Sequence, residues 1–460
     1  MNRVFTHGFD IFLLVTVFFM LLELATTTSY VALEISLIIL VISFVGMILT
    51  RHGFNPVKIL SRLMRRNKAS LLFWAVLAIY LILDFITLFY SPNITIAIAK
   101  YKVILLMLFI WLAISFYVED CEDLDSLLFA VAVTGHICSL LAVLNLSAVK
   151  LFERYYILRL SLRPDYNVFA AVVFMSLLTS FFLLMKSKYS FRYKLILILT
   201  DWIFLLPIIY LSSSRRTALI ALPACGVMLI LLCLNEKRQS NKARLVIDTV
   251  FTTAVAAVLA VLVVCGLTIY MNNVYLTKKA EGDLPKGVET SAAQRYEMPE
   301  ESEIGNKRRI IWSVAIDEYK SYNTKEKWFG KGAGYDIVLY DTVQSKELQE
   351  AYPDKIKVQG ALSAHNFILA DLLNGGIVKA VAGCMVWIAI AWNLLKLWSE
   401  QRIWAFLYCL TLGFVLVGCL ISNRFGFVYD KFFWLFAILL CMENRLMSED
   451  KRRGNDRWLM

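Results

Sequence analysis

The stretch Leu71–Tyr90, LLFWAVLAIYLILDFITLFY, carries a single charged side chain, Asp84. A run of about 20 apolar residues is long enough to cross the hydrocarbon core of a bilayer as an α-helix. Similar runs recur along the chain of 460 residues, which is 59% hydrophobic. In lipid, only helices satisfy all of their own backbone hydrogen bonds over such lengths. The sequence therefore predicts an all-α polytopic integral membrane protein.

About twelve of these runs are predicted to form transmembrane helices. They cover residues 10–24, 31–49, 71–90, 103–118, 126–146, 168–185, 195–213, 218–234, 246–271, 375–398, 403–422 and 432–446. This count places both termini in the cytoplasm, together with the four connectors in which basic residues concentrate, as the positive-inside rule expects. Those connectors are Arg51–Lys68, Lys186–Lys194, Lys237–Arg244 and Arg445–Arg457. The net charge of +11 is thus explained by topology, and nucleic acid is not an expected partner.

The same pattern predicts the domain organisation. The expected parts are residues 1–271 with the first nine spans, 272–364 as one large extracytoplasmic loop, 365–446 with the last three spans, and 447–460 as a basic cytoplasmic tail. The second half of the loop shows apolar residues at helical spacing. These residues are Ile311, Trp312, Ala315, Ile316 and Tyr319. We therefore expect the loop to be partly helical.

Two adjacent arginines, Arg215 and Arg216, follow Ser214 at the start of the eighth span. In the predicted topology they lie on the outer face, which the positive-inside rule disfavours. A helix N-terminus carries partial positive charge, so cations in its first turn are unfavourable unless an anion compensates them. Because guanidinium binds phosphate in a bidentate manner, the pattern favours a phosphate site. The alternative is that both arginines only anchor the span at lipid head groups.

One of the four histidines, His365, stands at the start of the tenth span, behind Ser363 as the expected N-cap. The helix dipole disfavours imidazolium there, so the ring is expected to be neutral and able to accept a proton. The alternative is an ordinary interfacial histidine. Further basic and amide side chains expected at the outer boundary are Arg163, Asn167, Arg308, Arg309 and Asn366.

The sequence offers no convincing metal site. Asp123-Leu124-Asp125 matches the Asp-x-Asp pattern of metal-dependent sugar transferases, but it lies in a short acidic connector on the predicted cytoplasmic face. No external segment carries a carboxylate cluster suited to Mg²⁺. The nine cysteines lie mostly in apolar runs, which argues against a zinc site and a disulfide framework. We expect neither a metal nor another cofactor.

Taken together, these motifs resemble the O-antigen ligase and O-antigen polymerase superfamily of bacterial cell envelopes. The matching elements, in chain order, are Phe89-Tyr90-Ser91-Pro92-Asn93, Arg163-Pro164-Asp165-Tyr166-Asn167-Val168-Phe169-Ala170, Ser214-Arg215-Arg216-Thr217-Ala218-Leu219, Arg308 ahead of Trp312, Phe329-Gly330-Lys331-Gly332, Ala364-His365-Asn366 and Gly375-Gly376. The resemblance implies a GT-C-like membrane glycosyltransferase architecture whose loop carries part of the active site. The family usually has one arginine after the serine, so Arg215 and Arg216 compete for that role.

The resemblance also implies a reaction. Its members move a glycan from an undecaprenyl diphosphate-linked oligosaccharide to an acceptor hydroxyl at the outer face of the bacterial cytoplasmic (inner) membrane, without a metal. His365 is then the implied base, and Arg308 with Arg215 or Arg216 the positive charge that stabilises the leaving diphosphate. Implied substrate-binding residues are Arg163, Asn167, Arg309 and Asn366. Membrane lipid and other polysaccharide-assembly proteins are further expected partners.

Three functions remain open at this point. A polymerase would use a second carrier-linked glycan as acceptor, and the long charged loop favours this reading. A ligase would join the glycan to lipid A–core with the same donor site. A transporter or flippase of a lipid-linked oligosaccharide would typically show internal repeats and ionisable residues near the bilayer midplane. No repeat is visible, and the main intramembrane candidates are Asp84 and His136, of which the histidine is expected to be a packed, hydrogen-bonded residue.

Overall fold

The structure, a computed structural model, describes residues 2–22, 27–52, 68–146, 156–163, 165–235, 242–282, 305–342, 346–352, 362–421 and 426–453, together with residues 55, 57, 59, 61, 63, 64, 291, 294 and 360. Throughout these parts of the chain the regular elements are helices, and no strand occurs among them. The prediction of an all-α fold is confirmed. The chain divides into two compact units, which are residues 1–54 with 122–298 (unit 1) and residues 55–121 with 299–460 (unit 2).

Within the described ranges, nine helices are long and apolar enough to cross a membrane. They are Val31–Thr50, Leu71–Tyr90, Cys121–Leu144, Tyr166–Lys186, Phe191–Leu211, Arg215–Leu234, Thr249–Ala280, Phe367–Glu400 and Arg402–Ile421. Two shorter apolar helices, Thr6–Leu21 and Tyr101–Tyr117, coincide with two more predicted spans, and the last predicted span lies in the helix Lys431–Arg453. The chain is therefore a multi-pass membrane protein, and the count of twelve crossings stays a prediction.

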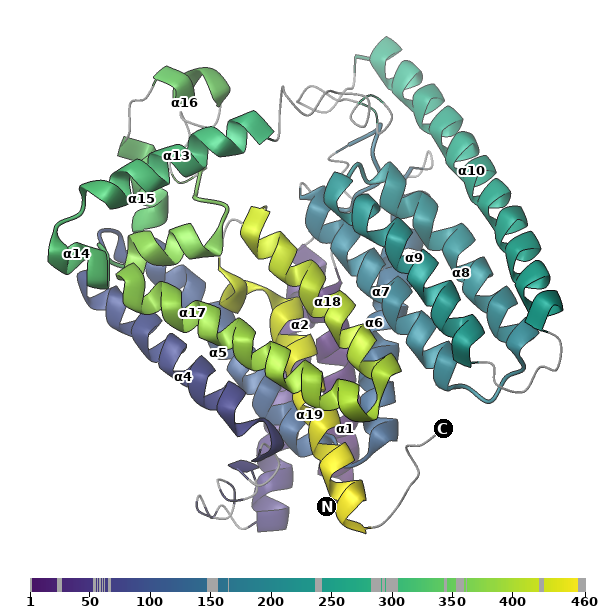
Figure 1. The fold of residues 1–460 in the computed structure, drawn as a ribbon, viewed down its shortest axis with the longest axis horizontal. Coiled ribbons are helices and arrows are strands. Elements are labelled where there is room, and N and C mark those ends of the chain that lie inside the picture. The colour runs from purple at the N-terminus through teal and green to yellow at the C-terminus, as the bar shows by residue number, and fades with distance from the viewer. Residues whose placement is uncertain are drawn as a thin grey trace. The chain divides into compact units, whose positions relative to one another are not determined.

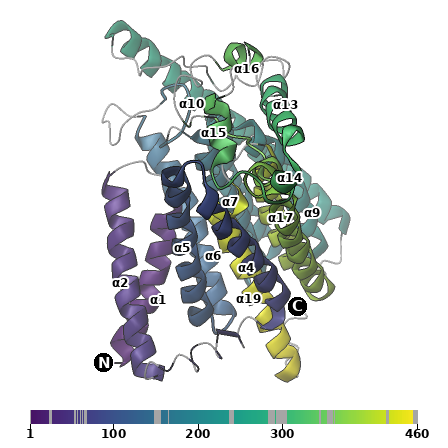
Figure 2. The same ribbon diagram turned by 90° about the vertical axis from the view of Figure 1, so that its left-hand side faces the viewer.

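Unit 1 consists of the first two helices and five consecutive long ones. These are α1 (Asn2–Leu21), α2 (Thr27–His52), α6 (Cys121–Leu144), α7 (Tyr166–Lys186), α8 (Phe191–Leu211), α9 (Arg215–Asn235) and α10 (Lys242–Ala280). α1 runs beside α2 (Figure 2), while α7 packs on α8 and α9, and α10 packs along α8 (Figure 1). In the apolar part of α7, 78% of residues are buried, against 6% in α10. Most of α10 is therefore left uncovered by the other helices of unit 1, and this helix extends from the predicted end of the ninth span at residue 271 to Ala280.

Unit 2 combines membrane helices with the folded part of the large loop. The membrane helices are α4 (Leu71–Ile86) with the 3₁₀ turn η2 (Thr87–Tyr90), α5 (Ile94–Tyr117), α17 (Phe367–Glu400), α18 (Arg402–Ile421) and α19 (Lys431–Arg453). The loop helices α13 (Gly305–Ser321), α14 (Thr324–Phe329), α15 (Tyr335–Thr342) and α16 (Lys346–Ala351) gather at one end of α4 and α5 (Figures 1 and 2). Ile311, Ala315 and Tyr340 are among the residues of their buried core. The prediction of a partly helical loop is confirmed.

α17 is two helical segments joined at Gly376, whose φ of 68° and ψ of −164° are not helical. Glycine adopts such a positive φ at little cost. A Cβ on Gly383 would lie 2.9 Å from a carboxylate oxygen of Asp371 and 3.5 Å from the Phe367 ring. In a straight helix, residues 12 and 16 positions apart are separated by about 18 and 24 Å along the axis. The short segment before Gly376 therefore folds back on the long segment after it.

The break in α17 provides backbone carbonyls to which the loop is attached. The Lys331 N–H and the Tyr322 hydroxyl donate to the Leu373 carbonyl at 3.0 and 3.1 Å. The Gly332 N–H donates to the Asn374 carbonyl at 2.9 Å. In an unbroken helix both carbonyls would accept from N–H groups of the next turn. The conformation at Gly376 therefore attaches the loop to the short segment.

Replacing Gly376 by alanine is expected to release the loop from α17. The added Cβ would lie 2.3 Å from the Trp328 carbonyl carbon, and the positive φ would itself cost about 1–3 kcal/mol. Limited proteolysis of the purified protein measures the release as faster cleavage within residues 305–342. The control is Gly413→Ala on α18, where a Cβ meets nothing within 4 Å. Equal cleavage of the two variants would contradict the role assigned to the break.

Candidate functional site

In unit 1, α9 begins at Arg215, directly after Ser214, as the sequence predicts. The Ser214 carbonyl accepts from the Ala218 N–H at 3.0 Å, and its hydroxyl lies 2.9 Å from the Thr217 hydroxyl. Arg215 and Arg216 are half-buried in the first turn. Their charges add to the positive end of the helix dipole. Two guanidinium groups at a helix N-terminus form an arrangement suited to an anion.

The turn that leads into α9 is tightly fixed. Ser212, Ser213 and Ser214 are fully buried, and Ser213 has a φ of 66°, which is uncommon outside glycine. Strained backbone of this kind costs about 1–3 kcal/mol and is found where surrounding structure fixes it, often at functional sites. The Leu160 N–H donates to the Leu211 carbonyl at 2.9 Å, which ties the turn to the segment before α7.

Asn167 belongs to the same end of unit 1. The Ser214 hydroxyl donates to the Asn167 side-chain oxygen at 3.0 Å. Asp165 caps α7 by accepting from the backbone N–H groups of Asn167 and of the next residue. Arg163 precedes this cap and is half-buried. Unit 1 therefore brings Asn167 to the turn directly before the paired arginines, while Arg163 precedes the cap of α7.

In unit 2, the N-cap of α17 is Asn366, so the prediction that Ser363 caps this helix is wrong. The Asn366 backbone is extended, and its side-chain oxygen accepts from the N–H groups of Ile368 and Leu369 at 2.9 and 3.2 Å. Asparagine is among the strongest N-cap residues, which explains the later start. His365 thus precedes the cap, half-buried and with a φ of 49°, rather than lying in the first turn.

The loop helix α13 lies beside this part of unit 2. The Trp312 indole N–H donates to the Ala364 carbonyl at 3.1 Å, one residue before His365. Arg308, which opens α13 together with Arg309, is half-buried, whereas Arg309 is exposed. The fold of unit 2 therefore associates the helix that carries Arg308 with the chain at His365 and Asn366. The predicted site residues form two groups of four, one in each unit.

An ion pair fixes the Gly-Lys-Gly turn of the loop. The Lys331 ammonium lies 2.7 Å from the Glu318 carboxylate and 4.5 and 4.9 Å from the ring centroids of Tyr322 and Tyr335. Burial raises the pKa of Glu318, but hydrogen bonds from Lys331 and Tyr335 lower it more, so the pKa lies below its usual value. Burial lowers the pKa of Lys331, and the hydrogen bond to Glu318 reverses that shift. Both groups are charged at neutral pH and stabilise the turn.

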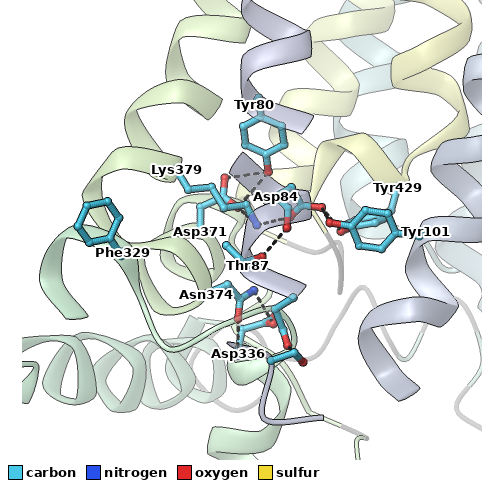
Figure 3. Close-up of polar contacts among 12 residues, drawn as sticks. Tyr80, Asp84, Thr87, Tyr101, Phe329, Asp336, Asp371, Asn374, Lys379 and Tyr429 are labelled. Carbon is cyan, nitrogen blue, oxygen red and sulfur yellow. Dashed lines mark hydrogen bonds and ion pairs between the residues drawn. The ribbon is translucent and has the colours of Figure 1, made fainter. Parts of the chain in front are cut away.

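A buried ionic cluster occupies the membrane part of unit 2 (Figure 3). The Lys379 ammonium lies 2.5 Å from the Asp84 carboxylate and 3.2 Å from the Asp371 carboxylate. Asp84 is 1% exposed, Asp371 3% and Lys379 4%. Charged side chains at such depth are costly and usually pair with one another, as they do here.

Three tyrosine hydroxyls complete the cluster. Tyr80 donates to Asp371 at 2.9 Å, while Tyr101 and Tyr429 donate to Asp84 at 2.8 and 2.9 Å. A small cavity of about 10 Å³ adjoins these groups and has room for about one water molecule. One ammonium is therefore shared by the two carboxylates, and the tyrosine hydroxyls donate hydrogen bonds to their oxygens.

Residues 202–382 match the model of the O-antigen ligase family. Over these residues the chain is similar to O-antigen ligases. The match begins within α8 and runs through α9, α10 and the loop into the long segment of α17. The resemblance to the O-antigen ligase and polymerase superfamily is thereby confirmed, and the match supports an enzyme of the ligase or polymerase type. No match was found among curated proteins.

The region that matches the O-antigen ligase family contains most of the predicted site residues. Those inside the match are Arg215, Arg216, Arg308, Arg309, His365 and Asn366, whereas Arg163 and Asn167 precede it. The individual roles of these residues stay predictions.

The sequence analysis did not identify Asp371 and Lys379, although both lie within the region that matches the O-antigen ligase family. It noted Asp84 only as an isolated intramembrane charge. One sequence pattern could have predicted the cluster: Lys379 lies inside the apolar run 375–398, and Asp84 lies inside the apolar run 71–90. Opposite charges in different membrane spans usually pair.

The other intramembrane candidate, His136, is hydrogen-bonded as predicted. Its Nδ1 lies 2.8 Å from the Ala132 carbonyl, and its Nε2 contacts the Asp201 carboxylate on α8. Of the Asp-x-Asp pair, Asp125 forms an ion pair with Lys186 at 2.5 Å. In the parts of the chain that the structure describes, no group of three or more His, Cys, Asp or Glu side chains is arranged to hold a metal ion.

Proposed function

We propose that the protein is a metal-independent glycosyltransferase that moves a glycan from an undecaprenyl diphosphate-linked donor to an acceptor hydroxyl at the outer face of the bacterial cytoplasmic membrane. The observation that carries the proposal is the O-antigen ligase match over residues 202–382. This range contains both the paired arginines that open α9 and the His365–Asn366 pair that precedes α17. The apolar helices and the basic connectors support the membrane setting.

The arginines of α9 are proposed to bind the donor diphosphate. A diphosphate is an anionic leaving group, so neutralising its charge is enough to let it depart. Arg215 and Arg216 offer bidentate hydrogen bonds, and the helix N-terminus adds N–H groups and a favourable dipole. Arg308 is proposed to supply further positive charge in the transition state. Additional contacts with the substrates are proposed for Arg163, Asn167, Arg309 and Asn366.

His365 is proposed to act as the general base on the acceptor. The acceptor oxygen forms a bond to the anomeric carbon of the donor glycan while the bond from that carbon to the diphosphate oxygen breaks. The electron pair leaves with the diphosphate, and the hydroxyl proton passes to the neutral imidazole. The ring is proposed to be neutral before transfer, as a general base requires. One direct displacement would invert the anomeric configuration.

Within this reaction we favour a polymerase over a ligase. The loop is a folded element whose helices share a buried core with the first segment of α17, which supports a role in holding a second glycan. The test is product analysis with purified protein and the carrier-linked repeat unit as the only glycan substrate. A polymerase produces a ladder of carrier-linked chains from this substrate alone. Products that form only after lipid A–core is added would assign the protein as a ligase.

The outward orientation makes a prediction for thiol labelling. In a cysteine-free background, Glu281→Cys at the end of α10 is expected to react with a membrane-impermeant thiol reagent applied to intact spheroplasts. Lys188→Cys, in the connector between α7 and α8, is expected to react only after the membrane is opened. Both positions are exposed, so access of the reagent decides the result. The reverse pattern would overturn the orientation and the proposed outer site.

A further inference from the structure

Lys379 links the two segments of α17 across the break at Gly376 (Figure 3). Asp371 lies in the short segment and Lys379 in the long one, and their charged groups are 3.2 Å apart. In a straight helix, residues eight positions apart are separated by about 12 Å along the axis. The link therefore forms because the short segment folds back, and it holds the two segments together.

Helix α4 contacts both segments at the same place. The Tyr80 hydroxyl donates to both carboxylate oxygens of Asp371, at 2.9 and 3.0 Å. Asp84, one helical turn further along α4, lies 2.5 Å from the Lys379 ammonium. α4 therefore holds the short segment through Tyr80 and the long segment through Asp84.

Stability alone gives no reason for this cluster. Taking two carboxylates and an ammonium out of water is costly, and apolar side chains of similar size often stabilise a buried position as well or better. The surroundings are nevertheless shaped for the charges, since a Cβ on Gly383 would lie 2.9 Å from the Asp371 carboxylate and 3.2 Å from the Tyr80 ring. What the ion pairs supply is a single, defined geometry of the two segments.

The short segment carries the proposed base at its N-terminal end. Its cap, Asn366, directly follows His365, and the carbonyl before His365 is held by the Trp312 indole. Its other end is tied to the loop, because Asn374 accepts from the Asp336 N–H at 2.9 Å and donates to the Asp336 carboxylate at 2.8 Å. A shift of the short segment therefore moves His365.

We propose that Lys379, acting with Asp84 and Asp371, is a positioning residue that fixes the short segment of α17 and thereby the place of His365. This inference rests on the proposed function, since it assigns the cluster a part in the transfer step. Loss of the link lowers kcat because the base is misplaced. The KM for the donor changes little, because the arginines that open α9 are untouched.

The test compares purified variants in the transfer assay. Lys379→Met removes both ion pairs and is expected to lower kcat about 100-fold, the usual effect of misplacing a catalytic group by about 1 Å. Lys379→Arg keeps the charge and its hydrogen-bond donors, and it is expected to restore part of kcat. Lys396→Met, at an exposed lysine of the same helix, is the matched control and is expected to behave as wild type.

A double variant distinguishes loss of the Lys379–Asp371 ion pair from a change in the net charge of the cluster. Asp84→Asn with Lys379→Met removes one charge of each sign, so the net charge of the cluster stays as in the wild type. This protein is expected to regain thermal stability relative to Lys379→Met while kcat stays low, because Asp371 still lacks its partner. If Lys379→Met does not fold, the double variant still allows kcat to be measured without the Lys379–Asp371 ion pair.

Three results would overturn the positioning role. They are wild-type kcat in Lys379→Met, full recovery of kcat in the double variant, and a rise in donor KM with unchanged kcat. Failure of the proposed function gives a different result, since the wild type would then form no product or His365→Ala would transfer normally.

Discussion

Arg216→Ala is expected to lower the kcat of glycan transfer about 10²–10³-fold, the usual cost of removing one positioned donor from a developing anion. Arg216 lies in the first turn of α9, half-buried, where its guanidinium adds to the helix dipole. Arg216→Lys is expected to recover only part of the activity, since an ammonium offers a point charge in place of a bidentate fork. Product formed by equal amounts of purified variant measures the effect.

Neighbouring and distant arginines provide the comparison. Arg308→Ala is expected to show a loss similar to that of Arg216→Ala, and the effect of Arg215→Ala shows which of the paired arginines contacts the diphosphate. Arg192→Ala, at an exposed position of α8, is the control and should retain transfer. If the alanine variants of Arg215, Arg216 and Arg308 all keep wild-type activity, the diphosphate site is wrong.

His365→Ala is expected to lower transfer about 10²–10⁴-fold, the usual contribution of a general base. The variant should still bind the carrier-linked donor, because the proposed diphosphate contacts are arginines. Donor binding measured by retention of the labelled lipid-linked glycan, together with single-turnover transfer, separates the two effects. His7→Ala, at an exposed histidine of α1, is the control for loss of an imidazole.

Two other outcomes would reassign His365. Loss of donor binding in His365→Ala would make the histidine a substrate-positioning residue. Near-normal transfer would remove it from the mechanism and leave the arginines as the supported part of the site.

The helices themselves could be predicted from the sequence because their signal is local. Apolar runs of membrane-spanning length identified every long helix, and the polar turn Ser212–Ser214 marked the start of α9 at Arg215. The helical spacing around Ile311 likewise identified α13 inside the loop. In each case the deciding residues lie within a few turns of one another.

The details around α17 could not be predicted in this way. Ser363 and Asn366 are both good N-cap residues, and the extended backbone at Asn366 decides between them. In the sequence, nothing distinguishes Gly376 from other glycines of membrane spans. Its special role depends on the close approach of the Trp328 backbone, which is distant in the chain.

Local sequence patterns do not predict the ionic cluster either. Lys379 lies 2.5 Å from Asp84, although almost 300 residues separate them in the chain. Such a pair depends on how α4 packs on α17. A single sequence shows the two charges but not their contact.

The central claim is tested most directly by purified, reconstituted protein supplied with an undecaprenyl diphosphate-linked glycan and its acceptor, with a chelator present and no ion gradient. We predict that a new glycosidic bond forms, that the carrier diphosphate is released, and that both products are lost in Arg216→Ala and His365→Ala. Movement of the intact lipid-linked glycan across the bilayer without a new bond, or transfer that stops when the chelator is added, would contradict it.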